Sequence, residues 1–181
     1  MSRARAPARR PAAGRRQIAG AACAAVLAGP ALAQSSPPPS GNAEAARIVA
    51  EAAAACAEEG AGDLRMAPDA YTAADLDGDR TGDLVIDFGR AICTGDPAFF
   101  SGTGGAPIAF VLGGQTSTAF VGLGWSVTDA PPMPDLDGPA RVILLRVHGS
   151  WCGAYGTSPC LRAITVTGGA FHTMGGALDE F

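Results

Sequence analysis

From Gly60 onward, short runs of apolar and β-branched residues alternate with clusters of glycine, proline and aspartate. Strands of this kind, bounded by turn residues and joined by short connections, are typical of antiparallel β-structure. The runs that we expect to be strands are residues 84–88, 108–112, 118–125, 141–148, 161–167 and 170–174. The pattern predicts an α+β fold that is mainly β, built as an antiparallel meander or sandwich.

One helix is expected before these strands. Asn42 is a suitable N-cap residue, and Gly60 tolerates the left-handed backbone at which helices often end. Between them, apolar residues recur at helical spacing and form one stripe: Ala45, Ile48, Val49, Ala52 and Cys56. This spacing predicts an amphipathic helix whose apolar stripe packs on one face of the sheet.

Four cysteines follow the N-terminal segment: Cys56, Cys93, Cys152 and Cys160. An even number in an exported domain indicates two disulfides, for which three pairings are possible. Cys152 and Cys160 flank a short segment rich in glycine, so we pair them, and Cys56 then pairs with Cys93 and fastens the helix to the sheet. The alternative is a nucleophilic Cys152 acting with His148, but it would leave Cys160 unpaired in an oxidising compartment.

The first 33 residues have the layout of a secretory signal peptide. Six arginines and no acidic residue precede an apolar run at 18–29, and Ala31-Leu32-Ala33 is a small-residue cleavage site. Gln34 is therefore expected to begin a periplasmic or secreted mature chain. A membrane anchor is less favoured, because the run is shorter than the roughly 20 residues that a spanning helix needs. Arg15-Arg16 leaves a twin-arginine export route open beside ordinary secretion.

Removal of residues 1–33 would leave a strongly acidic domain. Residues 34–41 are rich in serine, proline and glycine, so we expect a disordered linker, followed by a single domain over 42–181. After residue 33 the chain has 7 basic and 17 acidic side chains, a net charge of −10. Such a surface repels phosphate backbones, which argues against a nucleic-acid partner.

An aspartate-rich segment places Asp75, Asp77, Asp79 and Asp83 at positions 1, 3, 5 and 9 of a short loop. Ca²⁺ takes six to eight oxygen ligands at about 2.3–2.6 Å, and this spacing surrounds one point with carboxylates. Aspartate and glycine also favour plain turns, which is the competing explanation. Because four acids so close together would repel one another without a cation, the spacing favours a metal site, with Ca²⁺ as the cofactor.

This segment resembles the Asp-x-Asp-x-Asp-Gly-x-x-Asp-Leu calcium hairpin of FG-GAP and VCBS-type proteins, in which the ion lies in a turn between two strands. The apolar run after Asp83 fits that arrangement and does not fit a helix–loop–helix. The resemblance covers residues 75–88. It implies side-chain ligands from Asp75, Asp77, Asp79 and Asp83 and a backbone ligand from the Thr81 carbonyl. Arg80 stands where those hairpins usually have glycine.

The whole mature chain is similar to small secreted proteobacterial proteins of uncharacterised function. The segments that carry this resemblance are residues 75–88, 100–108 and 148–160. The resemblance implies export and supports the fold expected above, and it implies no activity. A cysteine pair commonly brackets the Gly-Thr-Gly-Gly segment in that group, whereas here Phe100, Ser101 and Ala106 lie in that region.

Catalytic motifs are absent from the sequence. It contains no Gly-x-Ser-x-Gly, no phosphate-binding loop and no zinc-binding helix with paired histidines. His148 and His172 are the two histidines, and general-base chemistry would need a positioned partner for one of them. The sequence therefore favours an exported, non-catalytic module with a Ca²⁺-stabilised loop, which binds a protein or glycan partner or has a structural role at the cell envelope. The alternative is a small secreted hydrolase that uses His148 with a carboxylate.

Overall fold

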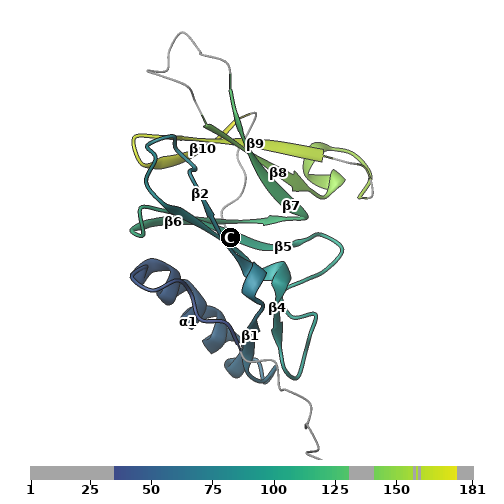
Figure 1. Ribbon diagram of the computed structural model, residues 1–181. Coiled ribbons are helices and arrows are strands. Elements are labelled where there is room, and N and C mark those ends of the chain that lie inside the picture. The colour runs from purple at the N-terminus through teal and green to yellow at the C-terminus, as the bar shows by residue number, and fades with distance from the viewer. Residues whose placement is uncertain (1–34, 131–140, 157, 159, 175–181) are drawn as a thin grey trace, which may run out of the picture. The chain divides into compact units, whose positions relative to one another are not determined.

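Apolar runs of the sequence form two four-stranded antiparallel sheets in a computed structural model of the chain, shown in Figure 1. The structure describes residues 35–130, 141–156, 158 and 160–174, all within one compact unit, Ala33–Phe181. The expected signal peptide at 1–33 and its cleavage point at Gln34 lie outside the described residues. The prediction of a mainly β fold with one helix and two disulfides is confirmed.

The elements follow one another in a simple order. They are α1 (Ala43–Glu58), β1 (Leu64–Met66), β2 (Tyr71–Ala74), β3 (Asp83–Asp87), β4 (Ala91–Cys93), β5 (Ala106–Leu112), β6 (Thr116–Gly122), β7 (Gly124–Asp129), β8 (Arg141–Val147), β9 (Cys160–Thr167) and β10 (Ala170–Met174). Short 3₁₀ helices cover Pro68–Ala70, Phe88–Arg90 and Gly149–Cys152.

Two four-stranded sheets form most of the domain. The first has the strand order β2-β3-β5-β6, and the second has the order β10-β9-β8-β7. β1 and β4 form a separate two-stranded ladder in which Leu64 lies opposite Cys93. Every pairing is antiparallel, as the short connections in the sequence predict.

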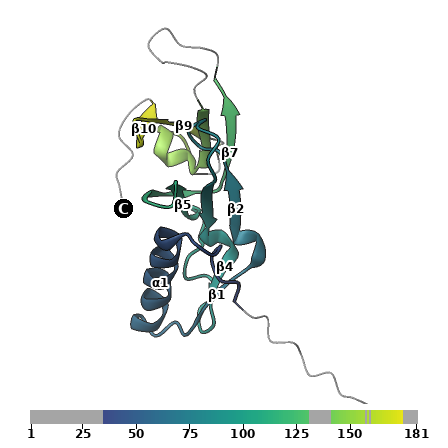
Figure 2. The ribbon, with the colours of Figure 1, turned by 60° about the vertical axis from the view of Figure 1, so that its left-hand side comes forward.

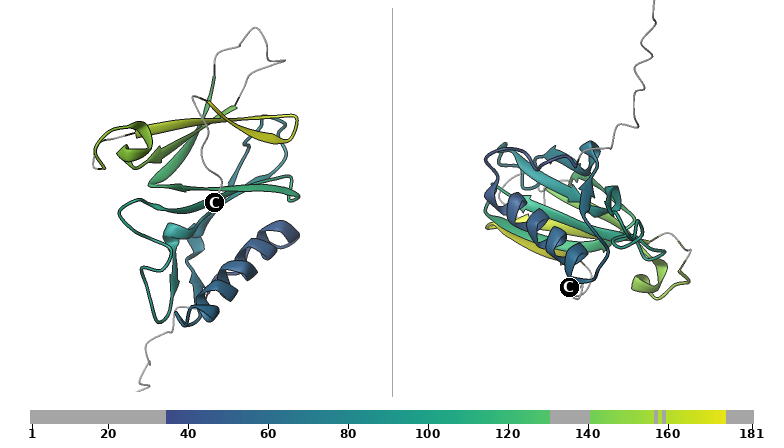
Figure 3. Two further views of the ribbon diagram at one scale, coloured as in Figure 1. Left: turned by 180° about the vertical axis from the view of Figure 1, so that it is seen from behind. Right: turned by 90° about the horizontal axis from the view of Figure 1, so that it is seen from below.

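Helix α1 covers one face of the first sheet, and the second sheet lies on the other face, as Figure 2 and both views of Figure 3 show. Ala109 and Val111 of β5 pack on the helix side, whereas Ile108 and Phe110 face the second sheet. β5 is thus buried on both faces, which explains why its sequence is continuously apolar and does not alternate.

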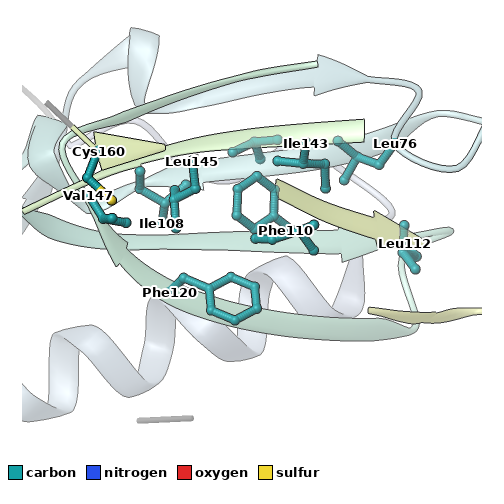
Figure 4. Packing of buried hydrophobic residues seen from close by; sticks show 11 residues of the cluster. Leu76, Ile108, Phe110, Leu112, Phe120, Ile143, Leu145, Val147 and Cys160 are labelled. Carbon is teal, nitrogen blue, oxygen red and sulfur yellow. The ribbon is translucent and has the colours of Figure 1, made fainter. Parts of the chain in front are cut away.

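The main core lies between the two sheets (Figure 4). Phe110 is fully buried at its centre, with Phe120 and Trp125 within aromatic contact distance, at ring centroid separations of 6.3 and 6.1 Å. The second sheet contributes Ile143 and Leu145, both fully buried. By comparison with measured substitutions, truncation of an aromatic side chain at such a position costs about 3–5 kcal/mol.

The helix begins and ends where the sequence predicts. The Asn42 side chain accepts the backbone N–H of Ala45 at 2.8 Å, and Gly60 takes a positive φ of 70° after the last turn. Cys56 on the buried stripe is bonded to Cys93 of β4, with a Cα–Cα distance of 5.7 Å. The predicted attachment of the helix to a sheet through this disulfide is confirmed, although the sheet is the small β1–β4 ladder.

Residues 118–125, which we expected to form one strand, belong to two strands, β6 and β7. The chain pairs with β5 as far as Gly122, and then pairs with β8 from Gly124 onward. Gly124 has a φ of 144°, and a Cβ at Gly122 would lie 2.6 Å from Leu145 Cδ1. These glycines therefore allow the chain to cross from one sheet to the other, which periodicity along the sequence does not reveal.

The short strands β1, β2 and β4 are not among the runs identified from the sequence, because each has only three or four residues. The first described residues of the expected linker are also hydrogen-bonded to the domain. Ser35 Oγ accepts the backbone N–H of Met66 at 3.1 Å, and Ser36 donates its N–H to the Met66 carbonyl at 3.0 Å. Among the described residues, no helix has the length and apolar character needed to cross a membrane.

Candidate metal centre

The aspartate-rich loop joins two adjacent antiparallel strands. β2 and β3 pair from Tyr71 opposite Ile86 to Ala74 opposite Asp83, so residues 75–82 form the connection of a hairpin. This is the strand–loop–strand arrangement expected from the apolar run after Asp83. The hairpin lies at one edge of the first sheet, since β2 is an edge strand in the order β2-β3-β5-β6.

Leu76 anchors the loop to the core between the sheets (Figure 4). Its side chain is fully buried, whereas the residues from Gly78 to Gly82 are exposed. The apolar residue between the first two aspartates thus fixes the start of the loop. The aspartates on either side of it, Asp75 and Asp77, are half-buried.

Asp83 fixes the other end of the loop. It is 2 % exposed, and both of its carboxylate oxygens accept backbone hydrogen bonds. Oδ2 accepts the N–H of Leu76 at 2.8 Å, and Oδ1 accepts the N–H of Gly113, in the turn between β5 and β6, at 2.9 Å. A buried carboxylate needs such donors to offset its lost hydration, and each oxygen keeps a further lone pair.

Three of the predicted ligands lie together. Asp75, Asp77 and Asp83 each offer a carboxylate oxygen, and these oxygens lie within 4.8 Å of one another. Two oxygens bound to one Ca²⁺ at 2.3–2.6 Å are separated by no more than about 5 Å. The donor set consists of hard oxygen ligands, which suits Ca²⁺ and does not suit a soft metal. The three carboxylates therefore fit one oxygen-seeking cation, whose remaining ligands would be backbone carbonyls and water.

Asp79 is outside this cluster. One of its carboxylate oxygens, Oδ1, accepts both the backbone N–H and the hydroxyl of Thr81, each at 2.6 Å. Arg80 between them has a φ of 66° and is the one non-glycine residue with a positive φ in the described part of the chain. It adopts the left-handed backbone that a glycine would adopt more easily, at a cost of about 1–2 kcal/mol. The arrangement of Asp79 and Thr81 is thus that of a local turn.

Burial and hydrogen bonding shift two carboxyl pKa values of the loop in opposite directions. The pKa of Asp77 is raised, first because burial removes water from its carboxylate and then because the negative charges of Asp83 and Asp79 lie nearby. The pKa of Asp79 is lowered, chiefly by the hydrogen bonds from the Thr81 hydroxyl and backbone N–H. Negative charge is thus less well stabilised on the carboxylate of Asp77 than on that of Asp79.

Arg141, at the start of β8, was not identified from the sequence as part of this site. Its Nη2 lies 3.4 Å from Asp75 Oδ2, and its Nε lies 3.2 Å from Asp129 Oδ1. Sixty-six positions separate Asp75 from Arg141, so no local signal links them. The guanidinium acts as an internal counter-ion to one carboxylate of the cluster.

The residues of the hydrolase alternative have other partners. Cys152 is bonded to Cys160, as predicted, with a Cα–Cα distance of 6.4 Å. Nδ1 of His148 is paired with the Ser150 hydroxyl at 2.7 Å and not with a carboxylate. The imidazole also packs closely on Gly156, since a Cβ there would lie 2.3 Å from His148 Cε1 and Nε2. Its contacts are those of a side chain that holds the 148–158 loop together.

No family model, curated protein or solved structure matches this chain.

Proposed function

We propose that this protein is an exported, non-catalytic module whose β2–β3 loop binds one Ca²⁺ ion. The observation that carries the proposal is the cluster of three carboxylates, from Asp75, Asp77 and Asp83, whose oxygens lie within 4.8 Å of one another. Ca²⁺ would neutralise their mutual repulsion and hold the start and end of the loop together. The function that follows is a rigid surface for a protein or glycan partner at the cell envelope, or a structural role there.

The position of the loop supports a stabilising role for the ion. Asp83 begins β3 and bonds to the β5–β6 turn through Gly113, while Leu76 is buried between the two sheets. An ion shared by Asp83 and the two earlier aspartates would therefore cross-link the hairpin loop to both sheets. A ligand that binds only the native state stabilises it by RT ln(1 + [L]/Kd), about 2.7 kcal/mol at 100-fold excess over Kd.

Calorimetric titration of the mature chain with CaCl₂, with thermal melting followed in parallel, tests the proposal. Extracellular modules commonly bind Ca²⁺ with Kd of about 10⁻⁴–10⁻³ M. We therefore expect one binding event in that range and a melting temperature that rises by several degrees in millimolar CaCl₂ and returns with EGTA. A calorimetric titration without heat of binding, together with an unchanged melting temperature, would mean that the loop is only a hairpin connection.

Export is a separate part of the proposal, supported by the layout of residues 1–33 and by the two disulfides. Disulfides persist in oxidising compartments and are rare where thiols are kept reduced. N-terminal sequencing of the protein recovered from the periplasm or medium of its host should begin at Gln34. Recovery of a form that retains Met1 in the cytoplasm, with free thiols, would contradict export.

A further inference from the structure

The outer face of the second sheet carries a groove of about 300 Å³ that the calcium proposal does not use. It is lined by Gly124, Trp125 and Ser126 of β7, Leu144 and Arg146 of β8, and Leu161 of β9. The strand register places Gly124, Arg146 and Leu161 in one row across the sheet, with Ser126 and Leu144 in the next. Neither row contains an acidic side chain, although the chain after residue 33 is strongly acidic.

Arg146 is the charged group of this groove. Its guanidinium extends over Gly124, where a Cβ would lie 3.5 Å from Nη2, and Nη2 donates to the Leu123 carbonyl. That bond holds the side chain across β7, while the residue remains exposed. No ion pair to Arg146 occurs within the part of the chain that the structure describes, whereas Arg47, Arg90 and Arg141 each pair with a carboxylate. A fixed guanidinium of this kind suits a carboxylate, because its planar fork can donate two parallel hydrogen bonds.

The strand beside this guanidinium has a free edge. Of the strands described, β7 pairs with β8 alone, so its other edge offers backbone donors and acceptors. Its sequence, Gly-Trp-Ser-Val-Thr-Asp, contains no lysine or proline, which commonly protect such edges. An extended peptide can add to an edge of this kind through main-chain hydrogen bonds.

Two leucine side chains lie beside Arg146 in the groove. Leu161 is a large side chain that is 63 % exposed, and Leu144 beside it is half-buried. Single apolar residues at a surface are common, but here Leu144 lies in the same groove as an exposed guanidinium, and Ser126 alone separates it from the free edge of β7. A ligand with a carboxylate, an apolar side chain and a peptide backbone would match these three features.

We propose that the β7 edge and this groove bind the C-terminal residues of a peptide or protein. The terminal carboxylate pairs with Arg146, the peptide backbone runs antiparallel to β7 from the Gly124 end, and an apolar side chain lies over Ser126 against Leu144. Charge complementarity selects this occupant, because among the described residues Arg146 has no carboxylate partner and the two rows of the groove contain no acidic side chain. The inference does not depend on the calcium site, which lies in the first sheet.

The test uses the mature protein and two probe peptides, acetyl-Ala-Val-Thr-Leu with a free carboxylate and the same peptide with a C-terminal amide. Backbone amide shifts followed by NMR should move in β7 and around Arg146 and Leu144 as the acid is added. The amide should bind at least about tenfold more weakly, since charge-assisted hydrogen bonds are about twice as strong as neutral ones. Binding of the acid should weaken as salt is raised.

Three variants complete the test. Arg146→Gln should abolish the preference for acid over amide, and Leu144→Ser should weaken binding of both peptides while it leaves Arg146 in place. Arg90→Gln, an exposed arginine outside the groove, is the matched control and should bind as wild type. Equal binding of acid and amide to the wild type, or shifts that map elsewhere, would overturn the proposal. So would unchanged binding in Leu144→Ser together with Arg146→Gln, provided that both variants melt like wild type.

Discussion

The carboxylate of Asp83 accepts the backbone N–H of Leu76 at 2.8 Å, across the whole aspartate-rich loop. The bond joins the first residue of β3 to the single buried residue of the connection, so the loop is closed at its base without any ion. A cation would then bind to a loop whose ends are already in position. Less conformational entropy is lost on binding when ligands are held in this way.

Asp77→Asn should remove most of the stabilisation by calcium. Asn retains an oxygen that can accept the Asp79 N–H, now at 3.0 Å, so the local turn is kept while one ligand charge is lost. In EGTA the variant should melt at or slightly above the wild-type temperature, because the carboxylate with the raised pKa has been neutralised. In millimolar CaCl₂ it should melt below wild type.

Asp96→Asn is the matched control for that experiment. Asp96 also accepts the N–H of the residue two positions on, Ala98, at 3.1 Å, but it lies outside the carboxylate cluster. Its effect on the melting temperature should be the same with and without calcium. If Asp77→Asn behaves like Asp96→Asn, the loop is a turn and not a metal site.

Arg141→Gln should strengthen calcium binding. The guanidinium competes with a cation for Asp75, and the pair is only partly exposed, at 33 % and 23 % for the two side chains. Exposed and half-exposed ion pairs contribute roughly 0.2–1 kcal/mol, so Kd should fall by a factor of about two to five. Without calcium the variant should be slightly less stable than wild type, because the carboxylates lose their internal counter-ion.

Arg90→Gln is the matched control for the variant Arg141→Gln. Arg90 pairs with Asp69 at 3.4 Å, the same distance as in the Arg141–Asp75 pair, but away from the loop. Calorimetric titration of Arg90→Gln should give the same Kd for calcium as the wild type. A Kd that Arg141→Gln leaves unchanged would mean that Asp75 does not contribute to the ion site.

Glu44 should make the domain sensitive to acid. Hydrogen bonds from the Arg47 guanidinium and the Ser117 hydroxyl lower its pKa from the ordinary 4.5 to about 2. A carboxyl group whose pKa is lower in the native state stabilises that state fully above pH 4.5, and the contribution is lost as pH falls from 4.5 to 2. Glu44→Gln should therefore be less stable than wild type at pH 6, by no more than about 1 kcal/mol because the Arg47 partner is exposed.

Melting curves between pH 6 and pH 2 measure this effect as the difference between wild type and Glu44→Gln. That difference should shrink towards zero at the acid end. Ser117→Ala removes only the hydrogen bond from Ser117 of β6 to Glu44 of α1. It should reproduce part of the loss of stability expected for Glu44→Gln. Parallel curves for wild type and Glu44→Gln over the whole range would contradict the assignment.

The two disulfides should differ in their contribution to stability. Cys56 and Cys93 are 37 positions apart and Cys152 and Cys160 only 8, so the loop-entropy model gives about 4 and about 2.6 kcal/mol. Replacing Cys56 and Cys93 by alanine should lower the melting temperature more than replacing Cys152 and Cys160. Both cysteines of the first pair are fully buried, so the lost packing adds to the difference. An equal loss in the two double variants would show that local rigidity of the 152–160 loop outweighs chain entropy.

Much of this architecture could be predicted from local patterns. The stripe of Ala45, Ala52 and Cys56 and the cap at Asn42 define α1, because helix formation depends on spacing and end groups within one segment. The Cys152–Cys160 pairing and the strand after Asp83 also followed from nearby residues, and the Cys56–Cys93 pairing then followed by elimination. The position of four aspartates in one loop is likewise a property of the sequence alone.

Other features depended on contacts between distant segments. The approach of Arg141 to Asp75 requires β8 to begin beside the β2–β3 hairpin, and the bond from Gly113 to Asp83 requires the first sheet to be assembled. The separation of Asp79 from the other three aspartates is local, since its carboxylate accepts the N–H of Thr81 two positions on, but the spacing of the acids did not reveal it. The spacing of charged residues determines which ligands are available. Packing determines which of them meet, because burial of Leu76 and Asp83 fixes the loop backbone in space.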